Sequence, residues 1–404
     1  MCAWQIQLRM IRTGKIYLFL AAIFAIGAAT AFAGTSKNEP VSAQNLHLDN
    51  IVPTQTNGPV CIVGRRFYNT PSQAFAEARD GDRIEVQAGT YHDVGVLKAN
   101  HVTVVGVNGR PRIDGQSKIA DGHGLWVIYG NNTTLDNFEM LHEDNGKRGE
   151  AAWDQAAVYL VGNNLTLRHL YIHDNMQGFF NATRAGSSCE LAIENSIFAL
   201  NGDGGGHSHN IYVNHNITKL TMRGVWSRDC RGGHILKVRA FESDIQGCLF
   251  TDPHGISLNW FLDFPDGGRH KFAGNIVEHN NRSSGSVLIA YGEEGLLNPA
   301  PHEMLSAQNT FINDGNGTFF KIQHVKASLQ ENIFAGKNAP IEPGNQVVVK
   351  EVLSNPAEYN YRVAKPDQGA TNFAVFMYES PANSVSRKDT SFGAYTPNFR
   401  PNNN

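Results

Sequence analysis

The chain of 404 residues is poor in cysteine, in charge and in long apolar runs. Five cysteines are too few to staple a fold of this size, so a hydrophobic core must hold it together. Beyond the N-terminal segment, no apolar run approaches the roughly 18 residues that suggest a transmembrane helix. Charged residues make up 18% of the chain and the net charge is −3, which excludes a nucleic-acid partner recruited by bulk charge.

The N-terminal segment, residues 1–33, has the three parts of a secretory signal peptide. The cations Arg9, Arg12 and Lys15 precede an apolar run over 16–26, and small residues end at Ala33. Cleavage after Ala33 removes these three cations and no acid, which changes the net charge from −3 to −6. We therefore expect a secreted or periplasmic protein that is free of the membrane after cleavage. We also expect it to act as a monomer.

Four cysteines remain after cleavage: Cys61, Cys189, Cys230 and Cys248. An exported protein enters a compartment in which disulfides are stable. Four cysteines allow three pairings, and the spacing in the sequence does not choose among them. Buried free thiols are an equally good interpretation.

A short phrase recurs between residues 167 and 334, in forms such as LRHLYIHDN, IENSIFALN and QENIFAG. Its apolar anchors are spaced by 27, 28, 24, 27, 34 and 23 residues, and they are Tyr171, Phe198, Trp226, Phe250, Val277, Phe311 and Phe334. Units of this length cannot bury an apolar face alone, so they must stack as a solenoid. Stacking also aligns equivalent residues along one side, which suits the binding of a long polymer.

The repeat predicts strands rather than helices, because its apolar runs are short and rich in β-formers and its turns are rich in Asn and Gly. Before it, Thr70 is a good N-cap and Pro71 a good first residue for a short amphipathic helix. We predict an all-β fold, a right-handed parallel β-helix with a short N-terminal capping helix. We expect a signal peptide at 1–33, a leader segment at 34–59, the β-helix at 60–335, and a C-terminal cover with a disordered tail at 336–404.

The segment GDRIEVQAGTY, followed by coils of the NxIF type, resembles the pectate lyase-like superfamily of parallel β-helix proteins. The resemblance covers about residues 60–335 and implies the fold, but the superfamily hosts lyases, hydrolases, epimerases, esterases and adhesins. Four further phrases, HNIYV, GHxLKxRA, DxPxGG and YGEEG, resemble secreted bacterial β-helix proteins associated with polysaccharide processing. That resemblance implies a polysaccharide partner without naming a reaction.

Polar residues are densest over 201–214, and the next coil adds the segment 232–240. With Leu236 and Val238 in the core, Lys237 and Arg239 point outward on one face, about 6.6 Å apart. The following coils depart from the anchor pattern near 263–266 and 291–294, and insertions on a solenoid tend to gather on its binding face. We predict one functional surface made of His207, His209, Asn210, Tyr212, Asn214, His234, Lys237, Arg239, Asn259, Asp263, Tyr291 and Glu293. Aromatic residues off the anchors, Trp153, Tyr159, Trp260 and Phe261, are candidates for stacking on sugars.

The paired cations suit β-elimination on a uronate, which needs a cation on the carboxylate, a base for the C5 proton and an acid for the leaving oxygen. We assign Lys237 and Arg239 to the first two roles, since a neighbouring arginine disfavours the charged form of the lysine. Tyr212 or His209 supplies the acid, and the other residues of the surface bind substrate. No metal site is predicted from His207 and His209, which lack a third ligand.

Some lyases of the pectate lyase-like fold combine a Lys and Arg pair with calcium on the substrate carboxylate. The resemblance therefore makes Ca²⁺ a candidate cofactor, with Asp263, Glu293 and Glu294 as oxygen ligands.

The sequence leaves three other functions open. Paired acids such as Asp263 and Asp266 would suit a glycoside hydrolase. The triplet Asp252-Pro253-His254 matches part of a motif of alginate C5-epimerases, although it falls where a turn is needed. A non-catalytic carbohydrate-binding scaffold would use the cations only to hold anionic groups. Our expectation is a carbon–oxygen lyase acting on an acidic extracellular polysaccharide.

Overall fold

The computed structural model describes residues 60–143, 154–186, 188–325 and 327–336, and the strand backbone at 347–354, 362–363 and 378–379. The predicted signal peptide and leader lie outside the described residues, as do Trp153 and most of the predicted C-terminal cover. Within the part of the chain that is described, no helix has the length and apolar character needed to cross a membrane.

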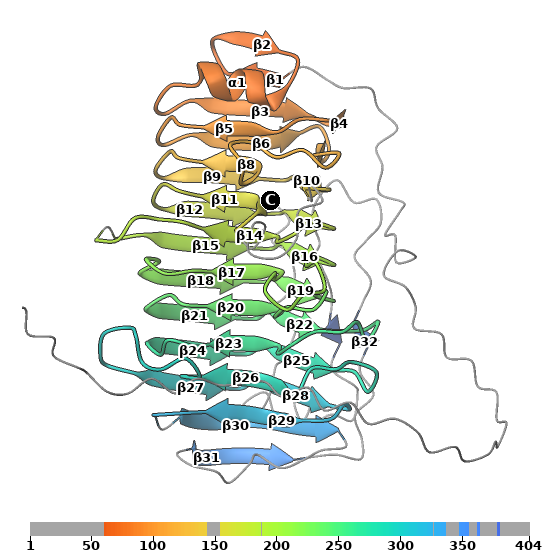
Figure 1. Cartoon of the computed structure of the whole chain (residues 1–404), viewed down its shortest axis with the longest axis vertical. Coiled ribbons are helices and arrows are strands. Elements are labelled where there is room, and N and C mark those ends of the chain that lie inside the picture. Colours follow the sequence, from red (N-terminus) through yellow and green to blue (C-terminus); the bar gives the residue numbers. More distant parts are fainter. Residues whose placement is uncertain are drawn as a thin grey trace, which may run out of the picture. The chain divides into compact units, whose positions relative to one another are not determined.

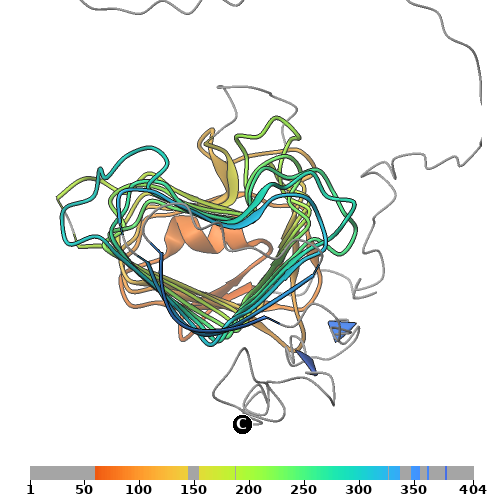
Figure 2. The same cartoon turned by 90° about the horizontal axis from the view of Figure 1, so that it is seen from below.

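The described chain coils around one axis, and successive coils add strands to three parallel ladders (Figures 1 and 2). The first ladder contains β3 (Arg83–Gln87), β6 (Thr103–Val107), β9 (Thr133–Asp136), β12 (Leu165–Arg168), β15 (Glu190–Glu194), β18 (Lys219–Arg223), β21 (Glu242–Gln246), β24 (Arg269–Ala273) and β27 (Glu303–Ala307). The second contains β4 (Thr90–Tyr91), β7 (Arg112–Asp114), β10 (Glu139–Leu141), β13 (Tyr171–His173), β16 (Ile197–Ala199), β19 (Trp226–Arg228), β22 (Leu249–Thr251), β25 (Ile276–His279) and β28 (Thr310–Asn313).

The third ladder is a separate nine-stranded sheet, and it carries the candidate site. Its strands are β5 (Gly95–Leu97), β8 (Gly124–Ile128), β11 (Ala156–Leu160), β14 (Phe179–Asn181), β17 (Ile211–Val213), β20 (Leu236–Val238), β23 (Leu262–Phe264), β26 (Val287–Tyr291) and β29 (Thr318–Ile322). The chain is thus the right-handed parallel β-helix that the repeat predicted.

Other elements lie at the two ends of the coils. At the N-terminal end, β1 (Val60–Ile62) pairs antiparallel with β2 (Arg66–Tyr68) and with β3, and α1 (Pro71–Glu77) begins at the predicted N-cap, Thr70. Phe75 of α1 packs edge-on against Trp126, 5.1 Å away between ring centres, so the helix caps the core. At the other end β30 (Ala327–Gly336) joins the first two ladders and pairs in parallel with β31 (Val347–Ser354). The remaining strands, β32 (Arg362–Val363) and β33 (Tyr378–Glu379), form an antiparallel pair.

The first two ladders meet at a two-residue turn whose first residue has positive φ in coil after coil. Asn137, Asn195, Gly224 and Gly274 occupy this position with φ between 43° and 66°. Asn and Gly adopt this conformation at low cost, which explains their recurrence in the repeat. In the later coils the second turn residue is asparagine, and Asn275, Asn309 and Asn332 form a buried hydrogen-bonded stack.

The core is a column of inward side chains, with Phe198, Phe250 and Phe311 among its largest buried members. Two predicted anchors, Tyr171 and Trp226, are out of register: Tyr171 pairs with Ile197, and Ile197 pairs with Trp226. Because a slip of one residue moves a side chain to the other face of a strand, these two residues belong to the outward row. The corresponding inward positions hold Ile172 and Ser227.

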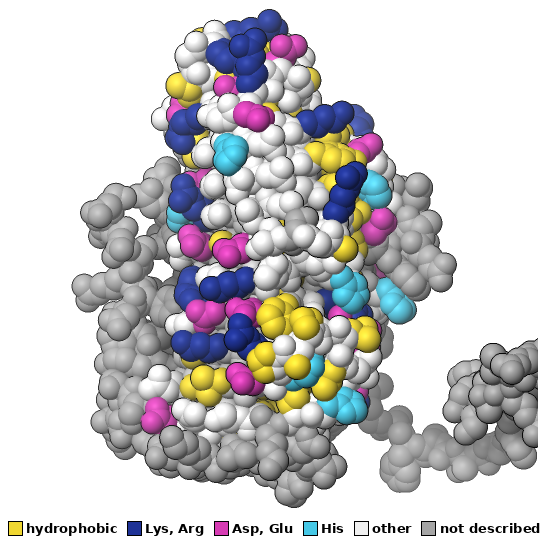
Figure 3. All heavy atoms as spheres, turned by 90° about the vertical axis from the view of Figure 1, so that its left-hand side faces the viewer, with side chains coloured by type: hydrophobic (Ala, Val, Ile, Leu, Met, Phe, Trp, Pro, Cys, Tyr) yellow, Lys and Arg dark blue, Asp and Glu magenta, His cyan; other side chains and the backbone are white. Residues whose placement is uncertain are grey.

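The outward face of the first ladder carries charges of alternating sign. In register, Glu190, Lys219, Glu242, Arg269 and Glu303 follow one another from coil to coil. Figure 3 shows these alternating rows of acidic and basic side chains on one face of the molecule. Opposite charges on neighbouring strands stabilise the pairing modestly and disfavour a shift in register.

All four described cysteines have free thiols: Cys189, Cys230 and Cys248 are buried and Cys61 is half-buried. Of the two interpretations that the sequence allowed, the structure therefore supports small buried side chains.

Candidate functional site

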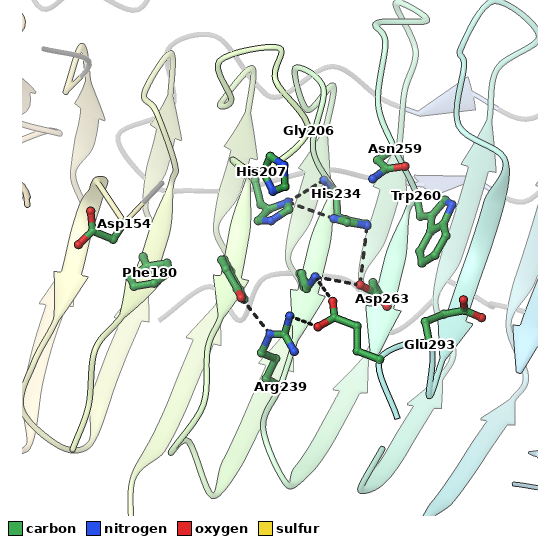
Figure 4. A pocket seen from close by; sticks show the side chains of 14 residues that line it. Asp154, Phe180, Gly206, His207, His234, Arg239, Asn259, Trp260, Asp263 and Glu293 are labelled. Carbon is green, nitrogen blue, oxygen red and sulfur yellow. Dashed lines mark hydrogen bonds and ion pairs between the residues drawn. The ribbon is translucent and has the colours of Figure 1, made fainter. Parts of the chain in front are cut away.

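The candidate site lies on the outward face of the nine-stranded sheet. The first residues of four strands in this sheet lie in the core: Phe179, Ile211, Leu236 and Leu262. Because side chains alternate along a strand, the second residues of these strands point away from the core. In successive strands these residues are Phe180, Tyr212, Lys237 and Asp263, which stand in register. With residues of the adjoining loops they line a pocket of about 580 Å³ (Figure 4).

Lys237 and Arg239 point into this pocket, and carboxylates hold both cations. Lys237 Nζ lies 2.9 Å from an oxygen of Glu294 and 3.4 Å from an oxygen of Asp263. Arg239 donates to Asp266 and to Glu294, each at 2.6 Å. The carboxylate of Glu294 therefore bridges the two cations with its two oxygens.

Tyr212 completes this network from the neighbouring strand. Arg239 Nε donates to the phenol oxygen of Tyr212 at 2.9 Å. Since that oxygen acts as the acceptor, the phenol proton is left for another partner. Burial opposes the charged form of Arg239, but Tyr212, Glu294 and Asp266 outweigh burial and raise the arginine pKa above its ordinary value. The guanidinium is a permanent cation in this pocket.

The two carboxylates on Lys237 have different acidities. Asp263 is 2% exposed, and burial raises its pKa to about 6 although Lys237 acts in the opposite direction. Burial also opposes the ionisation of Glu294, but hydrogen bonds from Lys237 and Arg239 prevail and lower its pKa to about 2. The sequence placed Asp263 on a departure from the strand, whereas it lies within β23 and opposite Lys237.

The role of base that we assigned to Lys237 does not suit this arrangement. The Lys237 nitrogen lies within 3.4 Å of the carboxylates of Asp263 and Glu294, so it is engaged in two ion pairs. The prediction counted the neighbouring arginine and not the acids that other coils bring.

His209 and His234 form one wall of the pocket and are almost fully buried. The backbone N–H of His234 donates to His209 Nδ1 at 2.8 Å, and the Nδ1 atoms of the two rings lie 3.2 Å apart. Burial lowers the pKa of both imidazoles, and the neighbouring cations act in the same direction, so that the pKa of His234 is about 3. Both rings are neutral at physiological pH.

Three other predicted residues, His207, Asn259 and Glu293, also line the pocket. The carboxylate of Glu293 accepts hydrogen bonds from Lys321 at 2.6 Å and from Gln323 at 2.8 Å. Among the proposed stacking residues, Trp260 lines the pocket, with Lys321 Nζ 5.0 Å from its ring centre.

Several predicted residues lie elsewhere. Asn210 is fully buried and bonds to Asn201, because it precedes the strand and turns inward. Tyr291 is in the core, where its hydroxyl donates to the carbonyl of Gly268; its position two residues after Ile289 puts both on the inward face. Asn214 is half-buried and does not line the pocket.

Two of the proposed stacking residues are also covered: Phe261 is a core residue, and Tyr159 is only 4% exposed.

The pocket lining includes Glu294, Phe180, Asp154 and Gly206, which were absent from the predicted surface. Asp266, which was also absent, contacts Arg239 without lining the pocket. Glu294 adjoins the predicted Glu293, and nothing in the local sequence shows which of the two acids turns toward the cations. Asp266 reaches Arg239 from the turn that follows β23 in the next coil, a contact that depends on loop geometry. Phe180 was accessible to sequence reasoning, because aligning QGFFN with HNIYV places it opposite Tyr212.

The acids that we considered as calcium ligands do not fit that role. Asp263 and Glu294 are neutralised by Lys237, and Glu293 by Lys321. Calcium prefers several carboxylate and carbonyl oxygens directed at one point, whereas these carboxylates are directed at different cations. In the described ranges, no group of three or more His, Cys, Asp or Glu side chains is arranged to hold a metal ion.

The epimerase-like triplet lies away from the pocket, after β22 of the second ladder. Asp252 accepts a hydrogen bond from the backbone N–H of Asn280, and His254 lies 2.9 Å from Asp229. Burial raises the pKa of Asp252 to about 8. These contacts fix a turn, in agreement with the structural interpretation of the triplet.

Comparisons with known proteins identify no relative by sequence: no family model and no curated protein matches the chain. Among solved structures, the chain is similar to pectate lyase Pel9A, with a TM-score of 0.49 and 14% identity over 71% of this chain and 73% of that one. It is also similar to a tailspike protein, a capsular polysaccharide depolymerase, from an Acinetobacter baumannii bacteriophage. That match has a TM-score of 0.37 and 10% identity over 69% of this chain and 58% of that one.

The strand pairing described above makes the fold a right-handed parallel β-helix. At these levels of identity and superposition, neither similarity assigns a reaction or a residue role to the chain.

Proposed function

We propose that this pocket binds an acidic, uronate-containing polysaccharide and cleaves it by β-elimination. The observation that carries the proposal is the position of Glu294, whose two oxygens lie on Lys237 and Arg239 at 2.9 and 2.6 Å. A carboxylate thus already lies between two cations on the outward face of the nine-stranded sheet. A uronate carboxylate that displaced Glu294 would meet the same two partners.

The chemistry of elimination matches the groups around that position. The slow step removes a proton next to the carboxylate, and negative charge then builds up on the carboxylate oxygens. Lys237 and Arg239 would stabilise this charge, and they are fixed in advance by Asp263 and Asp266. Tyr212, whose proton is not used by Arg239, would protonate the leaving oxygen.

Hydrolysis is the second candidate, and the acidities of two carboxyl groups favour it. Asp263 has a pKa of about 6 and Glu294 one of about 2, and both contact Lys237. Two nearby carboxyl groups of different acidity are what a glycosidase needs as acid and as base or nucleophile. The ion pairs of Glu294 count against this role, because they hold the carboxylate that would have to attack.

One assay separates these functions. The purified chain is incubated with polymers of different uronates, and both the ultraviolet absorbance of unsaturated uronate ends and the number of reducing ends are followed. Elimination raises both signals, and Arg239→Ala should lower the rate at least about 100-fold. Arg269→Ala, which removes an exposed arginine of the first ladder, is the matched control and should react at the native rate.

Each outcome of the assay decides among the candidates. Reducing ends without absorbance would replace elimination by hydrolysis. Binding of a uronate polymer without any product would make the protein a carbohydrate-binding scaffold, and failure to bind would refute the proposal. We further propose that the protein meets its polymer outside the cytoplasm, because residues 1–33 have the pattern of a secretory signal peptide.

A further inference from the structure

Two contacts join the pocket histidines His209 and His234, and Figure 4 labels His234 and draws its contacts as dashed lines. The backbone N–H of His234 donates to His209 Nδ1, and because an N–H group only donates, that nitrogen carries no proton. His234 Nδ1 is 3.2 Å from the same nitrogen, where two lone pairs would repel each other. His234 therefore carries its proton on Nδ1 and donates it to His209.

This tautomer leaves His234 Nε2 with a free lone pair. Among the described residues Nε2 has no hydrogen-bond partner, although the side chain is only 4% exposed. It lies 3.7 Å from an oxygen of Asp263, which is too long for a hydrogen bond, and that oxygen is also 3.4 Å from Lys237. Most buried polar atoms are paired, so an unpaired acceptor beside a carboxylate-binding cation points to a ligand that supplies a proton.

We propose that His234 Nε2 is the base that removes the C5 proton of the uronate, and that His209 is a positioning residue that fixes the tautomer of His234. This inference rests on the proposed β-elimination. The C5–H bond breaks, its proton moves to His234 Nε2, and its electron pair forms the new C4=C5 double bond. The C4–O bond then breaks, and the leaving oxygen takes the proton of Tyr212. His234 afterwards passes a proton back to Tyr212 through solvent, so the step needs no oxidant or cofactor.

The electrostatics of the pocket agree with this assignment. Burial first, and Lys237 next, keep the imidazole of His234 neutral at physiological pH, so it is ready to accept a proton. A bound uronate carboxylate brings negative charge close to the ring and makes it a stronger base. Lys237, by contrast, is engaged in ion pairs with Asp263 and Glu294, at 3.4 and 2.9 Å.

Two variants separate the candidate bases. His234→Gln should bind a uronate oligosaccharide with native affinity, while its rate of forming unsaturated ends falls at least about 100-fold. Lys237→Arg keeps a cation that cannot lose its proton, so it should retain a measurable rate of elimination. Added imidazole should restore part of the activity of His234→Ala, which a purely structural role for the ring would not allow.

The role of His209 has its own test. His209→Asn keeps an acceptor for His234, whereas His209→Leu removes it, so kcat should fall about 10-fold or more in the leucine variant, with KM nearly unchanged and partial recovery in the asparagine variant. Equal kcat values for the two variants would overturn the positioning role.

The remaining outcomes distinguish the two levels of the proposal. Native elimination by His234→Gln, or loss of elimination in Lys237→Arg alone, would overturn the assignment of the base and leave the lyase function intact. Absence of unsaturated ends from the unaltered protein would refute the lyase function and the base with it. Thermal unfolding followed by circular dichroism identifies a variant that fails to fold. If His234→Gln fails to fold, the recovery of activity by imidazole in His234→Ala decides whether the ring acts as the base.

Discussion

The carboxylate of Glu294 competes with any anionic ligand for Lys237 and Arg239, so its replacement by an amide tests what the pocket is built to hold. Its two hydrogen bonds lower its pKa to about 2 against the opposing effect of burial. Yet the side chain is 46% exposed, so solvent screens both pairs. We therefore assign each pair about 0.5–1 kcal/mol, well below the value that the shifted pKa alone would suggest.

Glu294→Gln keeps the size of the side chain and removes its charge. About 1–2 kcal/mol of competing interaction then disappears, and a uronate oligosaccharide should bind about 5- to 30-fold more tightly. A neutral oligosaccharide of the same length should bind as before, because it gains nothing from the freed cations. Isothermal titration calorimetry at constant ionic strength measures both affinities.

The neighbouring acid provides a matched control. Glu293 pairs with Lys321 and Gln323, outside the bridge that Glu294 makes, so Glu293→Gln should leave uronate affinity within about 2-fold of the native value. The reasoning fails if Glu294→Gln binds the uronate no more tightly than the native protein. It also fails if the neutral oligosaccharide gains as much as the uronate, since the effect would then be steric.

Two further predictions concern stability. Burial raises the pKa of Asp252 from 3.8 to about 8, so the native protein should lose stability as pH rises from about 4 to 8. Asp252→Asn has no carboxyl group to ionise, so it should not lose this stability. Its advantage over the native protein in free energy of unfolding should grow by on the order of 2–4 kcal/mol between pH 5 and pH 8. Parallel pH profiles of the two proteins in urea unfolding would contradict this. Asn309→Ala removes the centre of the asparagine stack and should cost about 2–4 kcal/mol in the same assay, against less than about 0.5 kcal/mol for the exposed Asn281→Ala; equal losses would contradict a role for the stack.

The fold could be predicted from the sequence because each coil has the same structural requirements. Every coil needs an inward apolar residue and a left-handed turn residue, and both leave a visible pattern. Alternation also placed Lys237 and Arg239 on one outward face. The same rule failed at Tyr171 and Trp226, because an aromatic residue that looks like an anchor can stand one position away from the true inward site.

The site was harder to predict because its contacts join different coils. Asp263 reaches Lys237 from the next strand, and Glu294 reaches it from the loop after the strand beyond. Which residues meet depends on the lengths and paths of the loops between strands, and these leave no periodic signal. The prediction therefore counted one neighbouring charge on Lys237, an arginine, where the structure adds two acids.

The location of the pocket follows from a change along one row of the nine-stranded sheet. In the strands that precede Tyr212, the outward residues Val127, Tyr159 and Phe180 form a small apolar cluster, and Tyr212 packs against it. Beyond Tyr212 the row continues with Lys237, Asp263, Ala290 and Lys321, of which all but the alanine are charged. An apolar wall excludes water from one side of these charges and strengthens every interaction they make. A charged face alone would hold an anionic polymer loosely, whereas charges at the edge of an apolar cluster can act on one carboxylate and one proton.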